Sequence, residues 1–584
     1  MRPLIILLFL CFVSSVHAQT PSAADWVEQL GDARYAVRKQ AARRLLQLGE
    51  AAFDDLLKAQ QHPKLEVALQ AKRLLYQLPI AWARDEDSHA VRELLQGYQH
   101  KPSRERLNLI EQLASLENAQ GAPAIRRIAR YEFSEQVSKR AALAAMRLIP
   151  ENAAQRKRLA EALQNADHSS RRTGVLWLEA FAKTLEAPEQ SMALWEKLSH
   201  QEERLLQNKP EQSHPEIVRD LLRWRVKQLE RLKRTEGART LLAQMVETID
   251  GETRPLIEMT DWLIVEENWE WVDWLAERFP QRFEEDPMLT YRLAEARLQA
   301  GKKEQAEQTA RQALLQKGRE IDDHALAGYW LKGRGRHAWA EKEYRRAIEQ
   351  SPKMELLETQ ARISLSELLH DQQRNREAAE ILQPLAESTH HQITFWIRRA
   401  GRTQNAVAAR MHYFSSLHHA KSGEPEKQQE QLQKCLEKSE EEIDGLIAYY
   451  RSAKPGSPQR IDAVARIRII ADDYMRRIRQ RRRQANEAAK ERERADRLAE
   501  LAVLCNQIAW LIGNTEGDYQ QALQFSRKSL ELRPKTAGFL DTLGRCYYAL
   551  GDYPNAVKYQ RQAVEQDPHN GQMQRQLKLF EKAL

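Results

Sequence analysis

The sequence offers few residues that could perform chemistry. It contains no His-Glu-x-x-His zinc motif, no Gly-x-Ser-x-Gly nucleophile motif and no Gly-x-x-x-x-Gly-Lys-Ser/Thr phosphate loop. His412 and His419 lie two helical turns apart, with His418 beside them, so their imidazoles could surround a metal ion. No cysteine or carboxylate at ligand spacing completes such a site, and surface or packing histidines are the expected alternative. We therefore predict no catalytic residue, no metal ion and no cofactor.

The densest charge in the chain is an arginine run at residues 476–483. Its members wind around one predicted helix and are Arg476, Arg477, Arg479, Arg481, Arg482 and Arg483. Two interpretations stay open: a solvated helix face of mixed charge, or a dock for an anionic surface such as envelope lipid, acidic polysaccharide or an acidic protein. Nucleic acid is not expected as a partner, because no aromatic residues interleave the run and the chain is predicted to be exported.

Length and composition indicate a long helical chain. Its 584 residues exceed what one compact core can enclose, which predicts several domains or a repeat array. Glycine (22) and proline (21) are sparse, while charged residues make up 30% of the chain. This combination favours solvated helices over β-rich or disordered structure. The net charge of +8 permits an acidic partner without requiring one.

The N-terminus is predicted to be a secretory signal peptide over residues 1–18. Arg2 precedes an apolar run at residues 4–13, and Val16-His17-Ala18 has the small residues of a cleavage site, so we expect cleavage after Ala18. The protein is then exported, to the periplasm or outside the cell. The absence of an Asn-x-Ser/Thr sequon favours a bacterial envelope. Three cysteines follow the leader, an odd and low number that excludes a disulfide framework, and we expect them to be buried: Cys435, Cys505 and Cys546.

The elements that must position any binding surface are helices in repeats. In residues 537–570, small residues stand where two helices must cross closely, a glycine stands at a turn and a proline follows the second helix. The residues at these positions are Gly544, Gly551, Ala556, Ala563 and Pro568, and an aromatic residue, Tyr547, stands at position 11 of the segment. The segment resembles a tetratricopeptide (TPR) repeat, the 34-residue helix–turn–helix unit. Since one hairpin cannot bury its apolar face alone, the resemblance implies stacked neighbours.

The same 34-residue period holds register upstream, in units that begin at Thr253, Pro287 and Ile321. Four tryptophans in the first of these units, Trp262, Trp269, Trp271 and Trp274, are expected to pack against the previous unit rather than to form a ligand cage. We predict a helix from Gln459 that runs unbroken into the C-terminal repeats. The predicted segments are a TPR-like array over 219–442, a loop and long charged helix over 443–502, two TPR repeats over 503–570 and a cap helix over 571–584.

The N-terminal part has a different pattern. Leu30 to Gly49 combines an aspartate in a turn with a Val-Arg pair and an alanine-rich second helix, at Asp32, Val37, Arg38, Ala41 and Ala42. This resembles HEAT-type repeats, in which the aspartate and the arginine can tie adjacent units together by hydrogen bonds. We predict HEAT-like repeats over 22–150 and an irregular helical connector over 151–218. The whole chain is then an all-α, right-handed superhelical solenoid.

The TPR resemblance also implies a binding surface. In this family the first helix of each unit lines a concave groove. The matching positions are Tyr291, Glu295, Tyr329, Lys332, Arg410, Tyr413, Lys421, Asp541, Arg545 and Tyr548. Their mixture of tyrosine with lysine and arginine suits peptides that carry acidic or C-terminal carboxylate groups.

We therefore predict a non-enzymatic scaffold of the bacterial cell envelope that binds a protein or peptide in its groove and takes no small-molecule substrate. Two alternatives remain open. One is an envelope enzyme or assembly factor for polysaccharide or peptidoglycan, which would need a pair of catalytic carboxylates in a cleft. The other is a structural protein that docks on anionic membrane through Arg476–Arg483.

Overall fold

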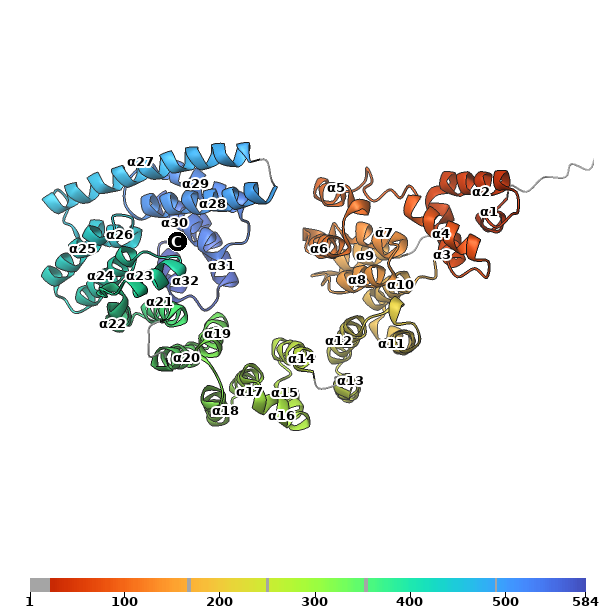
Figure 1. Cartoon of the computed structure of the whole chain (residues 1–584), viewed down its shortest axis with the longest axis horizontal. Coiled ribbons are helices and arrows are strands. Elements are labelled where there is room, and N and C mark those ends of the chain that lie inside the picture. Colours follow the sequence, from red (N-terminus) through yellow and green to blue (C-terminus); the bar gives the residue numbers. More distant parts are fainter. Residues whose placement is uncertain (1–20, 165–169, 248–251, 351–354, 489–490) are drawn as a thin grey trace, which may run out of the picture. The chain divides into compact units, whose positions relative to one another are not determined.

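The structure is a computed structural model that describes residues 21–164, 170–247, 252–350, 355–488 and 491–584. Every regular element in these ranges is a helix, which confirms the all-α prediction (Figure 1). The chain divides into two compact units, Met1–Asp250 and Gly251–Leu584, which are treated separately below. The predicted signal peptide at 1–18 lies outside the described residues. Within those residues we find no helix that is both long and apolar enough to span a membrane.

The first unit is built from short helices that pack in consecutive pairs. Its α-helices are α1 (Ala23–Gln29), α2 (Tyr35–Leu48), α3 (Phe53–Ala59), α4 (Leu65–Gln77), α5 (His89–Leu95), α6 (Ser103–Ala114), α7 (Ala122–Tyr131), α8 (Glu135–Met146), α9 (Ala153–Leu163), α10 (Thr173–Glu186), α11 (Pro188–Asn208), α12 (Pro215–Arg231) and α13 (Thr235–Glu247). Short 3-10 turns are η1 (Gly49–Ala52), η2 (Tyr98–His100), η3 (Glu117–Ala119) and η4 (Pro210–Gln212). Helix α1 packs on α2, α3 on α4 and α7 on α8, and α2 lies against α4. Each pair thereby buries an apolar face that a single helix would expose.

Asp32 and Arg38 of the first HEAT-like repeat have a structural role, but they bond within their own turn and not between adjacent repeats. Arg38 Nη1 donates to the backbone carbonyls of Asp32 (2.9 Å) and Ala33 (3.0 Å), which belong to its own turn. The Asp32 carboxylate accepts from the backbone N–H of Arg34 at 2.8 Å. A short aspartate side chain satisfies nearby backbone N–H groups before it can reach the next repeat. These residues therefore fix the turn between α1 and α2 locally.

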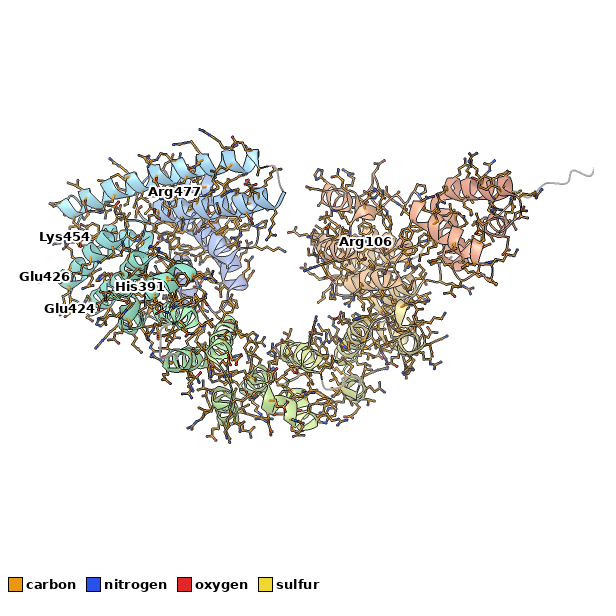
Figure 2. All side chains as sticks on the ribbon, in the orientation of Figure 1. Arg106, His391, Glu424, Glu426, Lys454 and Arg477 are labelled. Atoms are coloured by element: carbon orange, nitrogen blue, oxygen red, sulfur yellow. The ribbon has the colours of Figure 1, made fainter. Side chains whose placement is uncertain are left out.

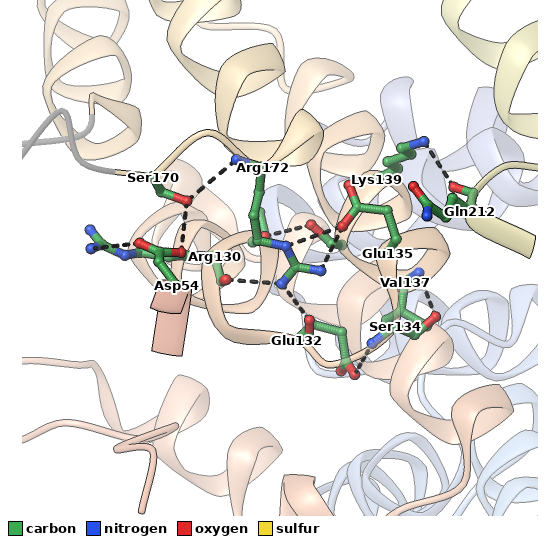
Figure 3. A network of polar contacts seen from close by, with 12 residues as sticks. Asp54, Arg130, Glu132, Ser134, Glu135, Val137, Lys139, Ser170, Arg172 and Gln212 are labelled. Carbon is green, nitrogen blue, oxygen red and sulfur yellow. Dashed lines mark hydrogen bonds and ion pairs between the residues drawn. The ribbon is translucent and has the colours of Figure 1, made fainter. Parts of the chain in front are cut away.

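Neighbouring repeats are connected by a polar network around Arg172 (Figure 3). Its guanidinium donates to the backbone carbonyls of Arg130 (2.9 Å) and Glu132, and to Glu135 Oε2 at 2.9 Å. The carbonyls at the C-terminal end of α7 have no partners within the helix, so Arg172 satisfies acceptors that would otherwise be left unpaired. Ser170 Oγ extends the network to Asp54 Oδ1 at 3.4 Å. The network thus connects α3, α7, α8 and α10.

The second unit repeats the same hairpin principle with longer helices. These are α14 (Thr253–Val265), α15 (Trp269–Arg278), α16 (Pro280–Glu285), α17 (Pro287–Gln299), α18 (Lys303–Leu315), α19 (Ile321–Gly333), α20 (His337–Gln350), α21 (Leu356–Asp371), α22 (Asn375–Ala386), α23 (His391–Arg399), α24 (Gln404–Lys421), α25 (Pro425–Lys438), α26 (Ile443–Ser452), α27 (Pro458–Glu487), α28 (Glu491–Asn514), α29 (Tyr519–Leu532), α30 (Ala537–Ala549), α31 (Tyr553–Gln566) and α32 (Gly571–Glu581). Helices α14, α17, α19 and α30 begin at the residues where the sequence period placed the start of a unit.

The hairpin of α30 and α31 has the close packing expected of its small residues. A Cβ atom added at Gly544 would lie 3.1 Å from the carbonyl oxygen of Ala556, so a side chain there would push the two helices apart. Ala556 and Ala563 are fully buried. Gly551 has a φ of 79°, a left-handed conformation that favours glycine at this turn. Tyr547 stacks on Tyr559 with the ring centroids 5.3 Å apart, and α31 ends before Pro568.

The prediction of one unbroken helix from Gln459 into the C-terminal repeats is wrong. Helix α27 ends at Glu487, Ala488 is extended (φ −64°, ψ 121°), and α28 packs back against α27 (Figure 1). The apolar stripe of α27, including the buried Ile467 and Tyr474, explains the difference. A continuous helix would leave that stripe in water, whereas folding α28 back covers it.

Candidate binding cavity in the second unit

Two adjoining cavities, of about 430 and 570 Å³, lie among the helices of the second unit. Their walls share Glu367, Asn570 and Gln572, and we call the two together the inner cavity. Side chains from α19, α21, α24, α26, α28 and α30 line it, together with the start of α32. Most of these are the first helices of their hairpins, as the predicted groove required.

The last helix closes the inner cavity by bonding to a helix far upstream. The Asp371 carboxylate accepts hydrogen bonds from the backbone N–H groups of Gly571 (2.9 Å) and Gln572 (2.8 Å) at the start of α32. Arg575 Nη1 also donates to the backbone carbonyl of Asp371 at 2.8 Å. A carboxylate at a helix N-terminus is stabilised by the free N–H groups and by the helix dipole. The predicted cap at 571–584 therefore joins α32 to α21 as well as covering the preceding repeat.

Arg410 occupies the centre of the cavity wall and is shared by three carboxylates. Its guanidinium lies 2.9 Å from Glu367 Oε1, 2.8 Å from Glu442 Oε1 and 2.8 Å from Asp444 Oδ2. Trp510 Nε1 donates to the other Asp444 oxygen at 3.0 Å. These contacts connect α21, α24, α26 and α28 through one positive charge.

The pKa values of the three carboxylates around Arg410 are shifted in different directions. Burial acts to raise the pKa of Glu367 and of Asp444, but the charge of Arg410 outweighs it and holds both below their ordinary values. Burial prevails at Glu442, whose pKa is raised. One guanidinium cannot neutralise three carboxylates, so this part of the wall keeps a net negative charge.

The smaller hollow of the inner cavity is acidic, and the predicted preference for acidic peptides does not fit it. Around the smaller hollow stand five carboxylates, Glu367, Glu441, Glu442, Asp444 and Asp541, against two arginines, Arg402 and Arg410. Arg410 is already surrounded by carboxylates, and Arg545 donates to the backbone carbonyl of Gly513 at 2.9 Å. Glu442 and Asp444 lie 32 and 34 residues from Arg410, about one repeat along the chain, whereas Glu367 lies 43 residues away.

Tyr291 and Glu295, two of the predicted groove residues, hold repeats together instead of facing the inner cavity. Tyr291 is 1% exposed, and its hydroxyl donates to Glu343 Oε1 at 2.5 Å. Glu295 accepts from Arg334 (2.5 Å) and Arg336 (3.1 Å). Both positions lie on α17, and their partners come from α20 and from the turn between α19 and α20. Their role is structural.

The remaining predicted groove residues are divided between the inner cavity and other surroundings. Its walls include Tyr329 (75% exposed), Lys332, Arg410 and Asp541. Tyr413 is half-buried beneath the Arg410 guanidinium, which lies 5.1 Å from its ring centroid. Lys421 is exposed at the end of α24, and Tyr548 stacks on Phe580 at 4.6 Å. Sequence reasoning missed Glu442, Asp444 and Trp510, because no repeat position marked them.

The comparison with protein families agrees with this geometry. Residues 537–570 match the family model described as tetratricopeptide repeat. The chain carries a TPR repeat. The matched residues are those of the α30–α31 hairpin, whose first helix contributes Asp541 to the inner cavity. A comparison with curated proteins found no match.

Several solved structures of helical-repeat proteins are similar to the chain at low identity. They include Pseudomonas aeruginosa pilF (16% identity, covering 51% of this chain and 97% of that chain, TM-score 0.20). The yeast Sti1 TPR2AB domain with pHSP90 gives 13% identity, coverage of 45% and 97%, and a TM-score of 0.16. The APC/C hetero-tetramer Cut9–Hcn1 gives 11% identity, coverage of 93% and 98%, and a TM-score of 0.23.

Outside the TPR repeat, half of the arginine run is paired with carboxylates. Arg477 contacts Glu441 at 2.5 Å (Figure 2), Arg476 contacts Asp473 at 3.0 Å and Arg481 contacts Glu500 at 2.8 Å. Arg479, Arg482 and Arg483 are exposed. The paired members support the interpretation as a helix face of mixed charge for that half of the run.

The candidate histidines, cysteines and tryptophans are hydrogen-bonded within the protein, buried or half-buried. His412 Nδ1 lies 2.7 Å from Gln431 Oε1, and His419 Nδ1 lies 2.7 Å from Glu424 Oε2. No group of three or more potential metal ligands occurs in the described part of the chain. The three cysteines are buried and free, as expected, and burial raises the pKa of Cys546 to about 12. The tryptophans at 262, 269, 271 and 274 are half-buried.

Asp541 in the inner cavity has a perturbed pKa that predicts a pH-dependent stability. Burial raises its pKa from 3.8 to about 6, although Gln560 (2.6 Å) and Gln576 (3.0 Å) donate hydrogen bonds to its Oδ1. The pKa of Asp541 is higher in the folded chain than in the unfolded chain, so protonation of this group favours the folded state. That contribution to stability is complete below about pH 4 and is lost as the pH rises to about 6.

Replacing Asp541 by asparagine should therefore stabilise the second unit at neutral pH. Asparagine keeps the acceptor oxygen without the cost of a buried charge, so we expect about 2–3 kcal/mol more stability at pH 7.5 and no gain at pH 4. Urea unfolding of both proteins at the two pH values measures this. Asp472→Asn, at an exposed position of α27, is the control and should change neither value. An equal gain at both pH values would contradict the raised pKa.

Proposed function

We propose that the second unit is a non-enzymatic scaffold that binds a basic segment of a partner protein in the inner cavity. The observation that carries this proposal is the charge of the wall, where five carboxylates face two arginines. A volume of about 430 Å³ accommodates lysine or arginine side chains, and the Trp510 ring on the same wall offers an aromatic surface to a cation. Helical-repeat arrays such as TPR proteins generally bind protein or peptide partners, which supports the class of ligand.

The state of the carboxylates favours binding over catalysis. Glu367, Glu442 and Asp444 are already bound to Arg410, and Asp541 accepts from two glutamine amides. Carboxylates fixed in this way are positioned acceptors for a cationic group. An envelope enzyme would need one of them to exchange protons with a substrate, and we find no arrangement that favours this second candidate.

We further propose that the helical pairs of residues 22–150 are HEAT-like repeats and that the protein belongs to a bacterial cell envelope, after export and cleavage behind Ala18. The support for this location is the predicted signal peptide in the sequence, since residues 1–18 lie outside the described structure. The location would supply partner proteins of the periplasm or of the cell surface.

Labelled peptides that differ only in charge test the ligand class. We expect fluorescence anisotropy to show binding of a lysine- and arginine-rich peptide, with affinity that falls as salt is added, and weaker binding of the matched glutamate-rich peptide. Asp541→Asn and Glu441→Gln should each weaken binding of the basic peptide about fivefold, the effect of roughly 1 kcal/mol.

Glu426→Gln provides the matched control for these variants. Glu426 is exposed on α25 and lies outside the residues that line the inner cavity (Figure 2). Its neutralisation removes one negative charge, as the other two variants do, so any effect common to all three variants reports long-range charge alone. Binding of the acidic peptide with equal or higher affinity would refute the proposed ligand class.

A further inference from the structure

Helices α2 and α4 of the first unit present equivalent faces side by side. The two helices pack against each other and are the second members of consecutive hairpins. Tyr35 is the first residue of α2 and Leu65 the first of α4; two positions later, Val37 is half-buried and Val67 is buried. Residues at the same distance from these starts therefore lie on the same side of the repeat array.

Large apolar side chains stand exposed on this shared face. Tyr35 is 67% exposed, Leu65 72%, Leu69 55% and Tyr76 67%. In α4 they recur at steps of four and seven residues, which places them on one stripe opposite the buried Val67, Ala71 and Leu74. The Tyr76 ring lies 4.2 Å from that of Phe133, which holds it in place on the surface. Exposed leucine and tyrosine side chains in one stripe indicate an interaction surface.

Cationic side chains share the face with these apolar residues. Lys39 and Arg43 on α2 and Lys72 and Arg73 on α4 are exposed, and none of them forms an ion pair within the described residues. The sequence of the two helices contains one acidic residue, Glu66. The arginine run on α27 differs in both respects, because three of its members are paired and its single apolar residue, Ile478, is half-buried.

The pair of α7 and α8 shows that the equivalent face is one the fold can cover. In α8 the corresponding positions are Lys139, Leu143 and Met146, all buried. Helix α11 covers Lys139 through Glu202, whose Oε1 lies 2.8 Å from Nζ, and α12 covers the neighbouring Arg140 through Glu216 and Asp220 (3.2 Å). Within the described residues, no later helix covers this face of α2 and α4, and the side chains that form it are exposed. A partner that covers this face must carry negative charge and must bury leucine side chains.

We propose that this α2–α4 face, formed by Tyr35, Lys39, Arg43, Leu65, Leu69, Lys72, Arg73 and Tyr76, docks on an anionic lipid membrane. Leucines can enter the acyl boundary while the long lysine and arginine side chains reach lipid phosphates. Tyrosine is enriched at that boundary. An acidic helix of a partner protein fits less well, because lysine is depleted from the centres of protein–protein interfaces. The proposal is independent of peptide binding in the second unit.

Co-sedimentation of the full chain with lipid vesicles tests this proposal. We expect recovery with phosphatidylglycerol–phosphatidylcholine vesicles, and little recovery with phosphatidylcholine alone or at high salt. Lys72→Gln/Arg73→Gln should lower the partition coefficient about tenfold or more, since each basic residue contributes near an anionic surface. Leu65→Ser/Leu69→Ser should lower it at least about tenfold through lost apolar burial. All four positions are exposed, so circular dichroism should show unchanged helix content.

Two matched variants separate this face from other surfaces. Arg482→Gln/Arg483→Gln removes the same charge from the exposed half of the arginine run, and Leu326→Ser removes a leucine that is equally exposed on α19. Both should bind vesicles as the unaltered chain does, within about twofold. Any contribution from residues 1–18 is common to all variants. Equal recovery of the α2–α4 variants and the unaltered chain would overturn the proposal, as would failure of the unaltered chain to bind anionic vesicles, which would favour an acidic protein as the occupant.

Discussion

Replacing Lys139 by methionine is expected to lower the free energy of unfolding of the first unit by about 3–5 kcal/mol. The side chains of Lys139 and Glu202 are both completely buried and lie 2.8 Å apart, and Lys139 Nζ also donates to the backbone carbonyl of Gln212 at 2.9 Å (Figure 3). Without the ammonium group, the Glu202 carboxylate would stay in an apolar interior with only the Ser213 hydroxyl as a partner. An uncompensated buried charge is far more costly than an absent pair.

Hydrogen exchange read by mass spectrometry locates this effect. Peptides from residues 21–247 should exchange faster in Lys139→Met, whereas those from 252–584 should not change, because repeat units depend on their neighbours. Lys139→Met/Glu202→Leu should recover most of the lost stability, since it removes both charges. Lys157→Met, at an 80% exposed position, is the control and should change stability by less than about 0.5 kcal/mol. A double variant no more stable than Lys139→Met would contradict this account.

Replacing Arg410 by methionine should destabilise the second unit by about 3 kcal/mol at pH 7.5. Glu367, Glu442 and Asp444 would lose the guanidinium that they share and would repel one another across the inner cavity. The arginine side chain is 21% exposed, so water relieves part of the repulsion and the effect falls at the lower end for a buried pair.

The loss in Arg410→Met should depend on pH in a defined direction. In the unaltered chain the guanidinium holds the pKa of Glu367 and Asp444 below their ordinary values despite burial, so it stabilises the fold where these groups are ionised in the unfolded chain. That stabilisation is lost as the pH falls, so the two proteins should differ less at pH 4 than at pH 7.5 in urea unfolding. Arg402→Met, at an exposed position of the same wall, should behave as the unaltered chain at both values. A difference independent of pH would show that lost packing is the cause.

The repeat architecture could be predicted from the sequence because its determinants are local. Gly544, Ala556 and Ala563 had to be small wherever two helices cross, and Gly551 had to adopt a left-handed conformation at the turn. Such requirements act within one hairpin, so the 34-residue spacing was visible without knowledge of any partner helix. The starts of α14, α17, α19 and α30 followed from the same spacing.

The orientation of individual groove side chains was predicted less well, because a repeat position does not specify what packs on it. Glu295 and Tyr329 are the ninth residues of α17 and α19, yet Glu295 is buried and Tyr329 is exposed. The difference comes from the turn between α19 and α20, whose Arg334 and Arg336 bond to Glu295. The turn after α27 was missed for a related reason: the helical pattern continues through residue 488, and only the apolar stripe that needed covering required the chain to reverse.

The sequence by itself determined that this protein is made of helical hairpins, where four of them begin and which residues let the hairpin of α30 and α31 cross closely. The tertiary structure alone decided the charge that the inner cavity offers to a ligand. Arg410 and Asp541 were visible as single residues, but Glu367, Glu442 and Asp444 reach Arg410 from α21 and α26, and Asp371 closes the cavity by binding α32. Helix formation depends on neighbours a few residues apart, whereas the net charge of a cavity depends on which distant helices bring their charges within a few ångströms.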